Sequence, residues 1–445
     1  MSRLFGTDGV RGIANLDLNG ELAFRLGRAA VVVLTEHGER RPHIVVGRDT
    51  RGNGEFLEAA LVAGICSAGG DAVTVGVCTT PGIAFLTTDL GAQAGAVISA
   101  SHNPAEYNGI KFFGSSGYKL PDEVEQEIES VVDRDAGPRP TGPAVGRVSN
   151  APDAEARYLA HLVSVADGRL DGMRVVVDCA NGAAFDASPR LLRSLGAEVL
   201  PLNDSPDGWN INAGCGATHP DVVARAVVEA GADAGVAHDG DADRALFADH
   251  LGNVVDGDQV LAACAVDLKE RGELPGDLLV VTVMANLGLR LAMAEAGVQL
   301  AETRVGDRYV LEEMRRSGAA LGGEQSGHVI FLRHATTGDG LLTSVQFLTL
   351  ASRKGVSLAD LGAAMKKFPQ VLLNVTVRDR DGLAEERSVW QAIREAEAAL
   401  GDQGRVLVRA SGTEPLIRVM VEAATEEQAA VQAEALARTV RTALG

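Results

Sequence analysis

Short apolar runs alternate with amphipathic segments along most of this chain. Residues 43–47 and 71–76 are runs rich in β-branched residues, and each predicts a buried strand. Residues 54–69 lie between them with apolar positions about 3.6 residues apart, which predicts a helix that ends at Gly69-Gly70. This order of strand, helix and strand is typical of parallel α/β layers.

The same order of elements recurs in two further segments. An acidic amphipathic helix at 121–134 and a Pro- and Gly-rich linker at 136–143 close the first unit, and new units begin near residues 152 and 257. The shared order indicates related domains, although no repeat is visible residue by residue. The strands predicted for the two units are residues 174–178, 197–200, 233–238 and 245–248, and then 278–283, 298–301 and 319–323.

The tail from about residue 370 has a different pattern. A strand at 372–378 and a helix near 386–400 precede two strands around 405–422 and a final helix from Glu426. This order indicates a smaller α+β domain. The fold expected is α/β, with three similar mixed α/β domains (each a sheet between helices) and a smaller C-terminal α+β domain, and the expected boundaries are 1–150, 151–254, 255–367 and 368–445.

Composition narrows the classes of function. The 445 residues are enough for several domains, and a chain that is 46% hydrophobic but only 4% aromatic predicts aliphatic cores. The formal net charge of −19 argues against sequence-independent binding of nucleic acid, although a local basic pocket could still bind a small anion.

Five cysteines without a Cys-x-x-Cys pair argue against a zinc site or a disulfide framework and favour a reducing compartment. With no apolar signal segment and no run of membrane-spanning length, we expect a cytoplasmic protein that binds neither membrane nor nucleic acid. Its oligomeric state stays open, a homodimer included.

Three carboxylates alternate within a loop between two predicted strands. Asp239, Asp241 and Asp243 would repel one another unless a positive group lies among them, and Mg²⁺ prefers such oxygen ligands. A calcium loop of the EF-hand type is excluded, because its sixth and twelfth positions would hold Arg244 and His250 instead of Gly and Glu. A solvated acidic turn is the alternative.

A second polar loop follows the apolar run that ends at Ile98. Ser101 lies on a tight loop closed by Asn103-Pro104, as a nucleophile or phosphate carrier would. Taken alone, these residues favour ordinary turn chemistry for Ser and Asn. Lys111 follows another turn. It is either a solvated surface lysine or a general base, if desolvation lowers its pKa.

Two later loops and the N-terminus carry further polar groups. In the Gly-rich segment 322–328, Glu324 and Ser326 suit sugar hydroxyls and His328 could transfer protons, since a core histidine is not expected there. In segment 409–418, two arginines flank Ser, Gly and Thr, a combination that favours a phosphate site over a plain hairpin turn. The glycines of segment 6–12 permit close backbone approach to a phosphoryl group, and the segment supplies an arginine.

Taken together, these segments resemble the α-D-phosphohexomutase superfamily, in the same order and over nearly the whole chain. Within the superfamily, the opening 5–12, the segment 306–310 and Gln325 resemble the bacterial members that act on glucosamine phosphates. Members that act on mannose or glucose phosphates more often have Met at the position of Gln325. The segments that carry the resemblance are Gly6–Gly12, Ser101–Pro104, Asp239–Arg244, Glu324–His328 and Arg409–Arg418.

The resemblance implies an isomerase that moves a phosphoryl group within a sugar phosphate. Glucosamine 6-phosphate and glucosamine 1-phosphate would interconvert through a 1,6-bisphosphate, on the route to UDP-N-acetylglucosamine and the cell wall. Ser101 would carry the phosphoryl group as a phosphoserine. Asp239, Asp241, Asp243 and the phosphate on Ser101 would bind Mg²⁺, and Arg244 would neutralise charge during transfer. Glucose 1,6-bisphosphate or glucosamine 1,6-bisphosphate would act as activator.

The resemblance also implies roles for the remaining loops. Glu324 and Ser326 would hold sugar hydroxyls, His328 and Lys111 are the candidates for proton transfer, and Arg11 would lie near the phosphoserine. A cleft with one loop from each domain would let the intermediate reorient and would exclude water. The phosphate that is not reacting would be held by Arg409, Ser411, Gly412, Thr413 and Arg418.

Three alternatives stay open at this point. A phosphomannomutase or phosphoglucomutase would use the same loops with another sugar. A Mg²⁺-dependent sugar phosphatase would need the acidic loop but would not retain a phosphoserine. A phosphosugar-binding module would need the two arginines but not Ser101.

Overall fold

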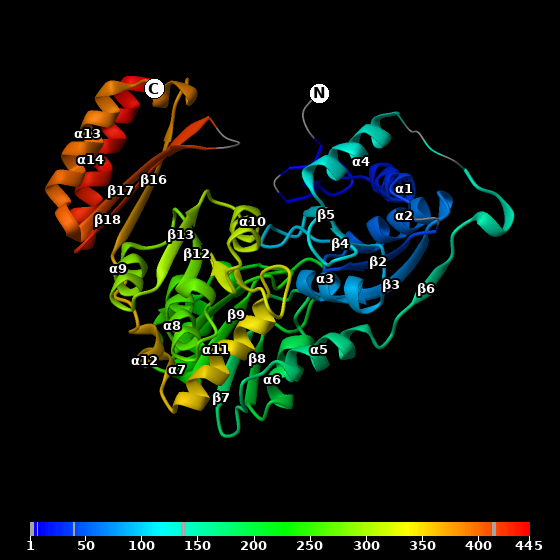
Figure 1. Ribbon diagram of the computed structural model, residues 1–445, viewed down its shortest axis with the longest axis horizontal. Coiled ribbons are helices and arrows are strands. Elements are labelled where there is room, and N and C mark those ends of the chain that lie inside the picture. The colour runs from blue at the N-terminus through cyan, green and yellow to red at the C-terminus, as the bar shows by residue number, and fades with distance from the viewer. Residues whose placement is uncertain (1–3, 7, 39–40, 135–136, 138, 412–414) are drawn as a thin grey trace. The chain divides into compact units, whose positions relative to one another are not determined.

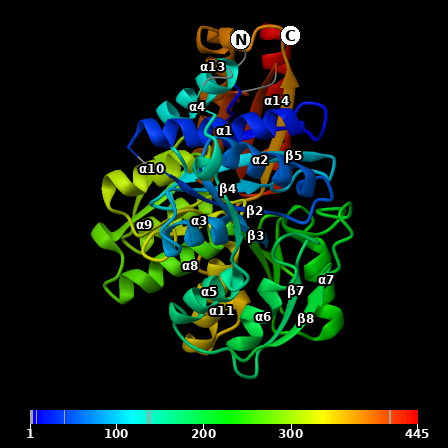
Figure 2. The same ribbon diagram turned by 90° about the vertical axis from the view of Figure 1, so that its right-hand side faces the viewer.

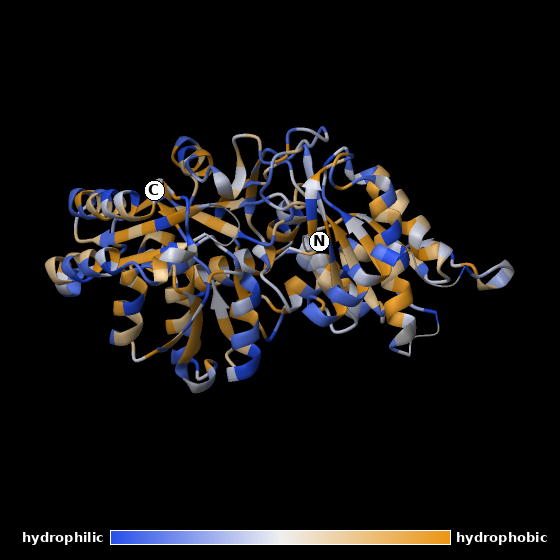
Figure 3. Cartoon of the chain, turned by 90° about the horizontal axis from the view of Figure 1, so that it is seen from above, coloured by the Kyte–Doolittle hydropathy of each residue, from blue (hydrophilic) through white to orange (hydrophobic). Residues whose placement is uncertain are grey.

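The computed structural model describes residues 4–6, 8–38, 41–134, 137, 139–411 and 415–445. These residues form four sheets with covering helices (Figure 1). They divide into two compact units, one of residues 1–284 and 298–363 and the other of residues 285–297 and 364–445. Figure 3 shows strands that are mostly hydrophobic and helices on which hydrophobic and hydrophilic residues alternate, as expected for sheets buried between helices.

The first sheet lies between two helical layers, with α3 on one face and α1, α2 and α4 on the other (Figure 2). Ile44 and Val46 of β2 pack toward α1 and α2, whereas Val45 packs against Ile83 of α3. Successive strand residues point to opposite faces, so this run of apolar residues fills both cores. The strands, in sheet order, are β1 (Val10–Ile13), β5 (Tyr107–Gly114), β4 (Ala94–Ile98), β2 (His43–Arg48), β3 (Asp71–Val77) and β6 (Val148–Asn150), and the helices are α1 (Gly20–Glu36), α2 (Gly54–Ser67), α3 (Thr80–Asp89) and α4 (Asp122–Arg134), with the short η1 (Gly142–Ala144).

The second and third sheets belong to the same compact unit as the first. Each is mixed, with parallel strands at its centre and an antiparallel hairpin at one side. The second contains β11 (Val254–Val255), β10 (Ala245–Asp249), β9 (Ala234–His238), β7 (Arg174–Asp178) and β8 (Glu198–Leu202), with α5 (Ala154–Ser164), α6 (Ala187–Ser194), η2 (Gly216–Thr218) and α7 (Asp221–Ala230). The third contains β13 (Gln299–Thr303), β12 (Leu278–Thr282), β14 (Leu321–Gly323) and β15 (Val329–Phe331), with α8 (Gly257–Glu270), η3 (Pro275–Asp277), α10 (Asp307–Ser317), α11 (Gly340–Lys354) and α12 (Leu358–Gly362).

The other compact unit combines the chain's tail with α9 (Leu287–Glu295). Glu422, buried on β18, accepts hydrogen bonds from the backbone N–H of Leu287 and the side chain of Asn286, at 2.9 and 3.2 Å. These bonds hold the start of α9 to the tail's sheet. The sheet is antiparallel, in the order β16 (Gln370–Thr376), β18 (Leu416–Ala423) and β17 (Gly404–Ala410), and it packs against α13 (Arg387–Leu400) and α14 (Glu426–Leu444), with η4 (Asp381–Ala384) and η5 (Gly401–Gln403) as short turns.

The elements predicted from the sequence are present in sheets that lie between helices, as expected, and each of the three larger sheets contains antiparallel as well as parallel strand pairs. Strand β4 pairs antiparallel with β5, β9 with β10, and β14 with β15. The reason is the length of each connection, since a few residues can join antiparallel neighbours but a parallel pair needs a long crossover. Three of the loops with candidate chemistry are those short connections. The strands that flank the fourth predicted loop, β17 and β18, are also antiparallel neighbours.

Two expectations from composition can be compared with the described residues. All five cysteines lie among them, and all are free thiols. Within the described part of the chain, no helix combines the length and the hydrophobicity that crossing a bilayer requires. The four domain boundaries stay a prediction.

Candidate active site

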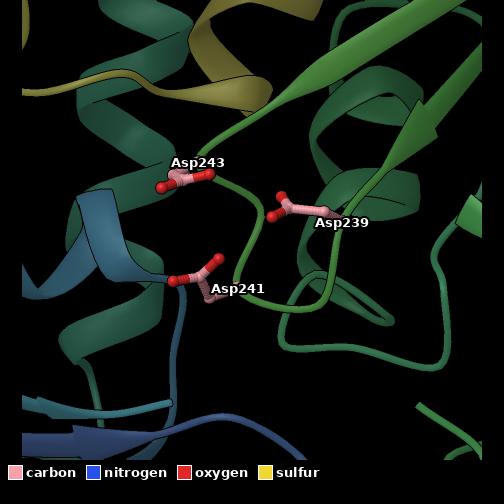
Figure 4. A group of neighbouring side chains, drawn as sticks. All are labelled: Asp239, Asp241 and Asp243. Carbon is pink, nitrogen blue, oxygen red and sulfur yellow. The ribbon is translucent and has the colours of Figure 1, made fainter. Parts of the chain in front are cut away.

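The acidic loop is buried, so the alternative of a solvated acidic turn is wrong. Asp239, Asp241 and Asp243 are 1%, 0% and 7% exposed, and they lie on the tight connection between β9 and β10. Their side chains converge on one space (Figure 4), and one carboxylate oxygen from each lies within 4.8 Å of the others. Ala242, between two of them, has a φ of +56°, a left-handed conformation that helps to turn alternate side chains inward.

The three carboxylates fit a hard divalent cation. The Oδ1 atoms of Asp241 and Asp243 are buried and have no hydrogen-bond donor. Burial, together with the charges of Asp243 and Asp241, raises the pKa of Asp239 well above its usual range. Buried carboxylate oxygens without donors are costly, and a bound Mg²⁺ would satisfy them with the oxygen ligands that it prefers.

Ser101 faces the acidic loop directly. Its side chain is buried in the connection between β4 and β5, and its Oγ donates a hydrogen bond of 2.6 Å to Oδ2 of Asp239. On its other side, Nδ1 of His102 lies 3.3 Å from the same Oγ. Burial, with the charges of Arg244 and Arg11, lowers the pKa of His102 to about 4, so this imidazole is neutral. The structure thus brings together the serine and the carboxylates that the sequence placed 138 residues apart.

Lys111 is buried on β5 and is not a surface lysine. Its Nζ lies 2.7 Å from Oδ2 of Asp8 and 3.4 Å from Oδ2 of Asp241. Burial alone would lower the pKa of Lys111, but these two carboxylates raise it above its ordinary value. The lowered pKa that the sequence argument required for a general base is therefore not found. Lys111 is a buried ammonium group at the edge of the site.

Arg11 lies beside Lys111, and both contact Asp8. Arg11 is on β1, which pairs with β5, and its guanidinium forms an ion pair with Asp8. Burial raises the pKa of Asp8, but Lys111 and Arg11 lower it to about 2. Two cations are thus held by one carboxylate. Asp8 lies in the Gly-rich segment 6–12, and nothing in the sequence identified it as a functional residue.

Thr80 is a contact that the sequence did not predict. Its Oγ1 donates to Oδ2 of Asp241 at 2.6 Å, and its N–H donates to the carbonyl oxygen of the same residue at 3.0 Å. Thr80 is the first residue of α3, and Thr79 caps this helix by accepting a hydrogen bond from the N–H of Gly82. A Thr followed by Pro at a helix start is a recognisable signal for the helix, but nothing local indicates that it faces an aspartate.

Arg244 and His328 both approach Asp243. Arg244 Nε is 3.6 Å from Oδ1, and His328 Nδ1 is 3.5 Å from Oδ2. Burial opposes ionisation of Asp243, but the charges of His328 and Arg244 lower its pKa far below the ordinary range. Asp243 is therefore an anion that two basic side chains stabilise.

His328 is in the core, contrary to the sequence argument. It is 2% exposed, and its Nε2 accepts a hydrogen bond of 3.1 Å from the N–H of Gly338. Burial lowers the pKa of His328, whereas Asp243 raises it to about 9. Nδ1 carries a hydrogen toward Asp243, and because Nε2 accepts from Gly338 in this geometry, full protonation of the ring requires that the hydrogen bond to Gly338 is lost.

The rest of the predicted sugar loop lies between β14 and β15. Glu324 is partly buried and accepts a hydrogen bond of 3.2 Å from the N–H of Gly306, whereas Ser326 is exposed. A cavity of about 290 Å³ opens beside His328. Charged side chains of both signs line it, among them Lys119, Glu123, Asp307, Arg308 and Arg315. Such a lining suits a polar ligand.

The predicted phosphate loop belongs to the other compact unit. Arg409 on β17 and Arg418 on β18 are directly opposite in the antiparallel ladder. Burial and the charge of Arg418 lower the pKa of Arg409. Ser411 is buried and its N–H donates to the carbonyl of Leu416 at 2.9 Å. Gly412 and Thr413 lie outside the described residues.

A buried serine that faces three carboxylates, on hairpin loops of mixed sheets, is the arrangement that the resemblance to phosphohexomutases implies. Comparison of the chain with models of known protein families agrees with this resemblance. The models of phosphoglucomutase/phosphomannomutase α/β/α domains I, II and III match residues 2–138, 156–252 and 256–368, and the model of the C-terminal domain matches residues 372–439. The chain belongs to the phosphoglucomutase/phosphomannomutase family.

Its curated relatives narrow this class further. A protein named phosphoglucosamine mutase from Symbiobacterium thermophilum is 56% identical, and the match covers 100% of both chains. A second phosphoglucosamine mutase, from Thermobifida fusca, is 55% identical over 100% of this chain and 99% of its own.

Solved structures share the fold. A phosphoglucomutase/phosphomannomutase family protein from Burkholderia thailandensis superposes with a TM-score of 0.84 at 25% identity, covering 100% of this chain and 98% of that one. The N-acetylphosphoglucosamine mutase of Aspergillus fumigatus, solved with GlcNAc-6P and magnesium, is 20% identical with a TM-score of 0.70, covering 99% and 96%. At this identity the second likeness concerns the fold alone.

Proposed function

We propose that the protein is a phosphoglucosamine mutase, which interconverts glucosamine 6-phosphate and glucosamine 1-phosphate. One observation carries the proposal: Ser101 Oγ lies 2.6 Å from a carboxylate of a buried acidic triad that has unsatisfied oxygens. A hydroxyl at this position can carry a phosphoryl group and present it to the groups around it. The full-length relatives named phosphoglucosamine mutase, at 51–56% identity, support glucosamine phosphate as the substrate.

The reaction consists of two transfers. In the first, the C1 hydroxyl oxygen of glucosamine 6-phosphate attacks the phosphorus of phosphorylated Ser101. The P–Oγ bond breaks, the sugar hydroxyl loses its proton, and Oγ takes one up, which leaves glucosamine 1,6-bisphosphate. After this intermediate reorients, Oγ loses its proton and attacks the phosphorus at C6. The bond between that phosphorus and the C6 oxygen breaks and the oxygen takes up a proton, so that glucosamine 1-phosphate leaves and the phosphoserine forms again.

The charged residues around Ser101 provide for the charge on the moving group. Asp239, Asp241 and Asp243, with the phosphate on Ser101, would hold Mg²⁺, and the ion supplies positive charge at the phosphoryl oxygens. Arg244 adds a guanidinium from the acidic loop, and its backbone N–H already donates to Asp239 at 3.2 Å. The rate of phosphoryl transfer rises most when the charge on the moving group is neutralised in a site closed to water.

The remaining assignments concern protons and substrate. Lys111 and His328 are the candidates for proton transfer, and Arg11 lies close enough to Lys111 to share the same carboxylate. Glu324 and Ser326 would hold sugar hydroxyls. The phosphate that does not react would be held by Arg409, Ser411, Gly412, Thr413 and Arg418. Glucose 1,6-bisphosphate or glucosamine 1,6-bisphosphate would restore the phosphoserine when it is lost.

Intact-protein mass measurement tests the phosphoserine. Incubation with glucose 1,6-bisphosphate and Mg²⁺ should add the mass of one phosphate to the protein and none to Ser101→Ala. Ser115→Ala, at an exposed serine, is the matched control and should be phosphorylated like the parent. Mutase activity retained in Ser101→Ala would refute the mechanism.

A substrate panel separates the remaining functions. Turnover should be highest with glucosamine 6-phosphate and lower with glucose and mannose phosphates. If glucosamine 6-phosphate is the poorest of the three, a phosphomannomutase or phosphoglucomutase is the better assignment. Release of inorganic phosphate without a bisphosphate indicates a phosphatase, and binding without turnover indicates a phosphosugar-binding module.

A further inference from the structure

Ser101 has an unusual backbone conformation. Its φ is +51°, in the left-handed region that a residue with a side chain seldom occupies. Such a conformation persists only where the surroundings impose it. Because the direction of Cβ follows from the backbone, the groups that fix this peptide also decide where Oγ points.

A closed set of hydrogen bonds fixes the peptide groups on both sides of Ser101. Its N–H donates to Oγ of Ser99 at 3.0 Å, and that hydroxyl donates to Oδ2 of Asp49 at 2.6 Å. Asp49 forms an ion pair with Arg51. The guanidinium of Arg51 then returns to the loop and donates to the carbonyl oxygens of Ser101 and Asn103 at 3.1 and 2.5 Å. Ser99, Asp49 and Arg51 are fully buried, so this closed set of hydrogen bonds is rigid.

Asn212 completes this arrangement from a different part of the chain. It lies between β8 and η2, and its Nδ2 donates to the carbonyl oxygens of Ser101 and Asn103 at 2.9 and 3.1 Å. Two acceptors on one side identify this atom as the amide nitrogen. Gly240 of the acidic loop packs directly against this hydrogen bond. A Cβ on Gly240 would lie 2.6 Å from the carbonyl oxygen of Ser101 and 2.8 Å from Nδ2 of Asn212, so no side chain fits there.

We propose that Asn212 is a positioning residue for phosphoryl transfer. With Arg51, it holds the carbonyl of Ser101 in place, keeps the serine in its left-handed conformation and so aims Oγ at the acidic loop. Asn212 contacts none of the reacting atoms. This inference rests on the proposed function, since it assumes that Ser101 carries the phosphoryl group.

Asn212→Asp tests the inference with almost no change in volume. The substitution replaces the donor by a carboxylate oxygen that faces two carbonyl oxygens, so the loop must shift. The control is Asn210→Asp on the same loop, where the side chain donates to the carbonyl of Ser205 and does not touch the serine loop. Asn212→Ala is the second variant, which removes the donor without adding a charge.

The measurement isolates the transfer step. Each protein is phosphorylated with glucose 1,6-bisphosphate, its phosphoserine is recorded by ³¹P NMR without Mg²⁺, and glucosamine 6-phosphate with Mg²⁺ then starts a single turnover that is followed by rapid quench. A misplacement of about 1 Å can cost roughly 100-fold in rate. We expect the transfer rate of Asn212→Asp at saturating sugar to fall about 100-fold and that of Asn212→Ala about 10-fold. The KM should change by less than about threefold, and the phosphoserine resonance should shift or broaden.

The outcomes are distinct. If Asn212→Asp and Asn212→Ala transfer phosphate at the parent rate with an unchanged resonance, the positioning role is refuted. If both Asn210→Asp and Asn212→Asp lose the same rate, the loop acts only as a structural element and the inference is again wrong. A parent protein that takes up no phosphate refutes the proposed function itself.

Discussion

Neutralising Asp239 should stabilise the protein when no metal is bound. Oxygens of the three carboxylates lie within 4.8 Å of one another, and two unit charges at that separation repel by about 3.5 kcal/mol at an effective dielectric constant near 20. Two neighbours therefore cost Asp239 about 7 kcal/mol as an anion. Arg244 offsets part of this cost, and the raised pKa of Asp239 lets it take up a proton instead. We expect a net gain of about 2 kcal/mol for Asp239→Asn at pH 8. The amide oxygen of this variant keeps one of the two hydrogen bonds that Asp239 accepts, from Ser101 and from the N–H of Arg244.

Differential scanning fluorimetry with and without Mg²⁺ measures this effect. A gain of about 2 kcal/mol corresponds to a rise in Tm of roughly 3 °C for a unit of this size. Saturating Mg²⁺ should stabilise the parent protein by about 3 kcal/mol at 100 times its Kd, and should have little effect on Asp239→Asn. The variant should thus be the more stable protein without metal and should lose this advantage when metal is present.

Asp249→Asn is the matched control on the same hairpin. Asp249 is also buried, but it accepts hydrogen bonds from the N–H groups of Leu251 and Asn253 and is not part of the acidic triad. We expect this variant to lose about 1 kcal/mol and to keep its response to Mg²⁺. The reasoning fails if Asp239→Asn lowers the Tm without metal and retains the full Mg²⁺ shift.

Three further predictions concern other parts of the chain. Burial raises the pKa of Asp339 to about 6, so its ionisation should cost the folded state up to about 3 kcal/mol as pH rises from about 4 to 6; a scan of Tm against pH should show this loss in the parent and not in Asp339→Asn. Arg418→Gln should raise the KM for the sugar phosphate about 10-fold or more without destabilising the fold, because it removes a like charge directly opposite Arg409; an unchanged KM would exclude the phosphate role. Gly338→Ala should destabilise the protein by about 2 kcal/mol or more in thermal or urea unfolding, because a Cβ there would lie 2.4 Å from the ring of His328, and a stable, active variant would contradict the packing.

Much of the fold follows from local patterns. The strands β2, β3, β7 and β12 and the helices α2 and α4 lie within a few residues of the predicted ranges, because each buries a continuous apolar run or an apolar stripe. The direction of pairing did not follow from these patterns. Whether β10 runs parallel or antiparallel to β9 depends on the short connection between them, and that connection is the acidic loop.

The candidate site was predicted as a set of loops but not as a set of contacts. Asp239, Asp241, Asp243 and Ser101 were identified because their residue types and spacing are unusual. Thr80, Asn212, Arg51 and Asp8 were not identified as site residues, since each is ordinary in its local sequence. Their contacts with the site become visible only when segments far apart in the chain pack together.

The sequence by itself determined which elements form, which loops carry polar groups and which family the chain resembles, since these depend on residue type and spacing. The tertiary structure alone decided the electrostatic state of those groups. Lys111 could have been a base of lowered pKa, but two carboxylates from other segments lie beside its ammonium group and raise its pKa. His328 could have been an exposed acid or base, but packing buries it between Asp243 and Gly338. Charge and burial at a site depend on neighbours in space, and these are fixed only when the chain folds.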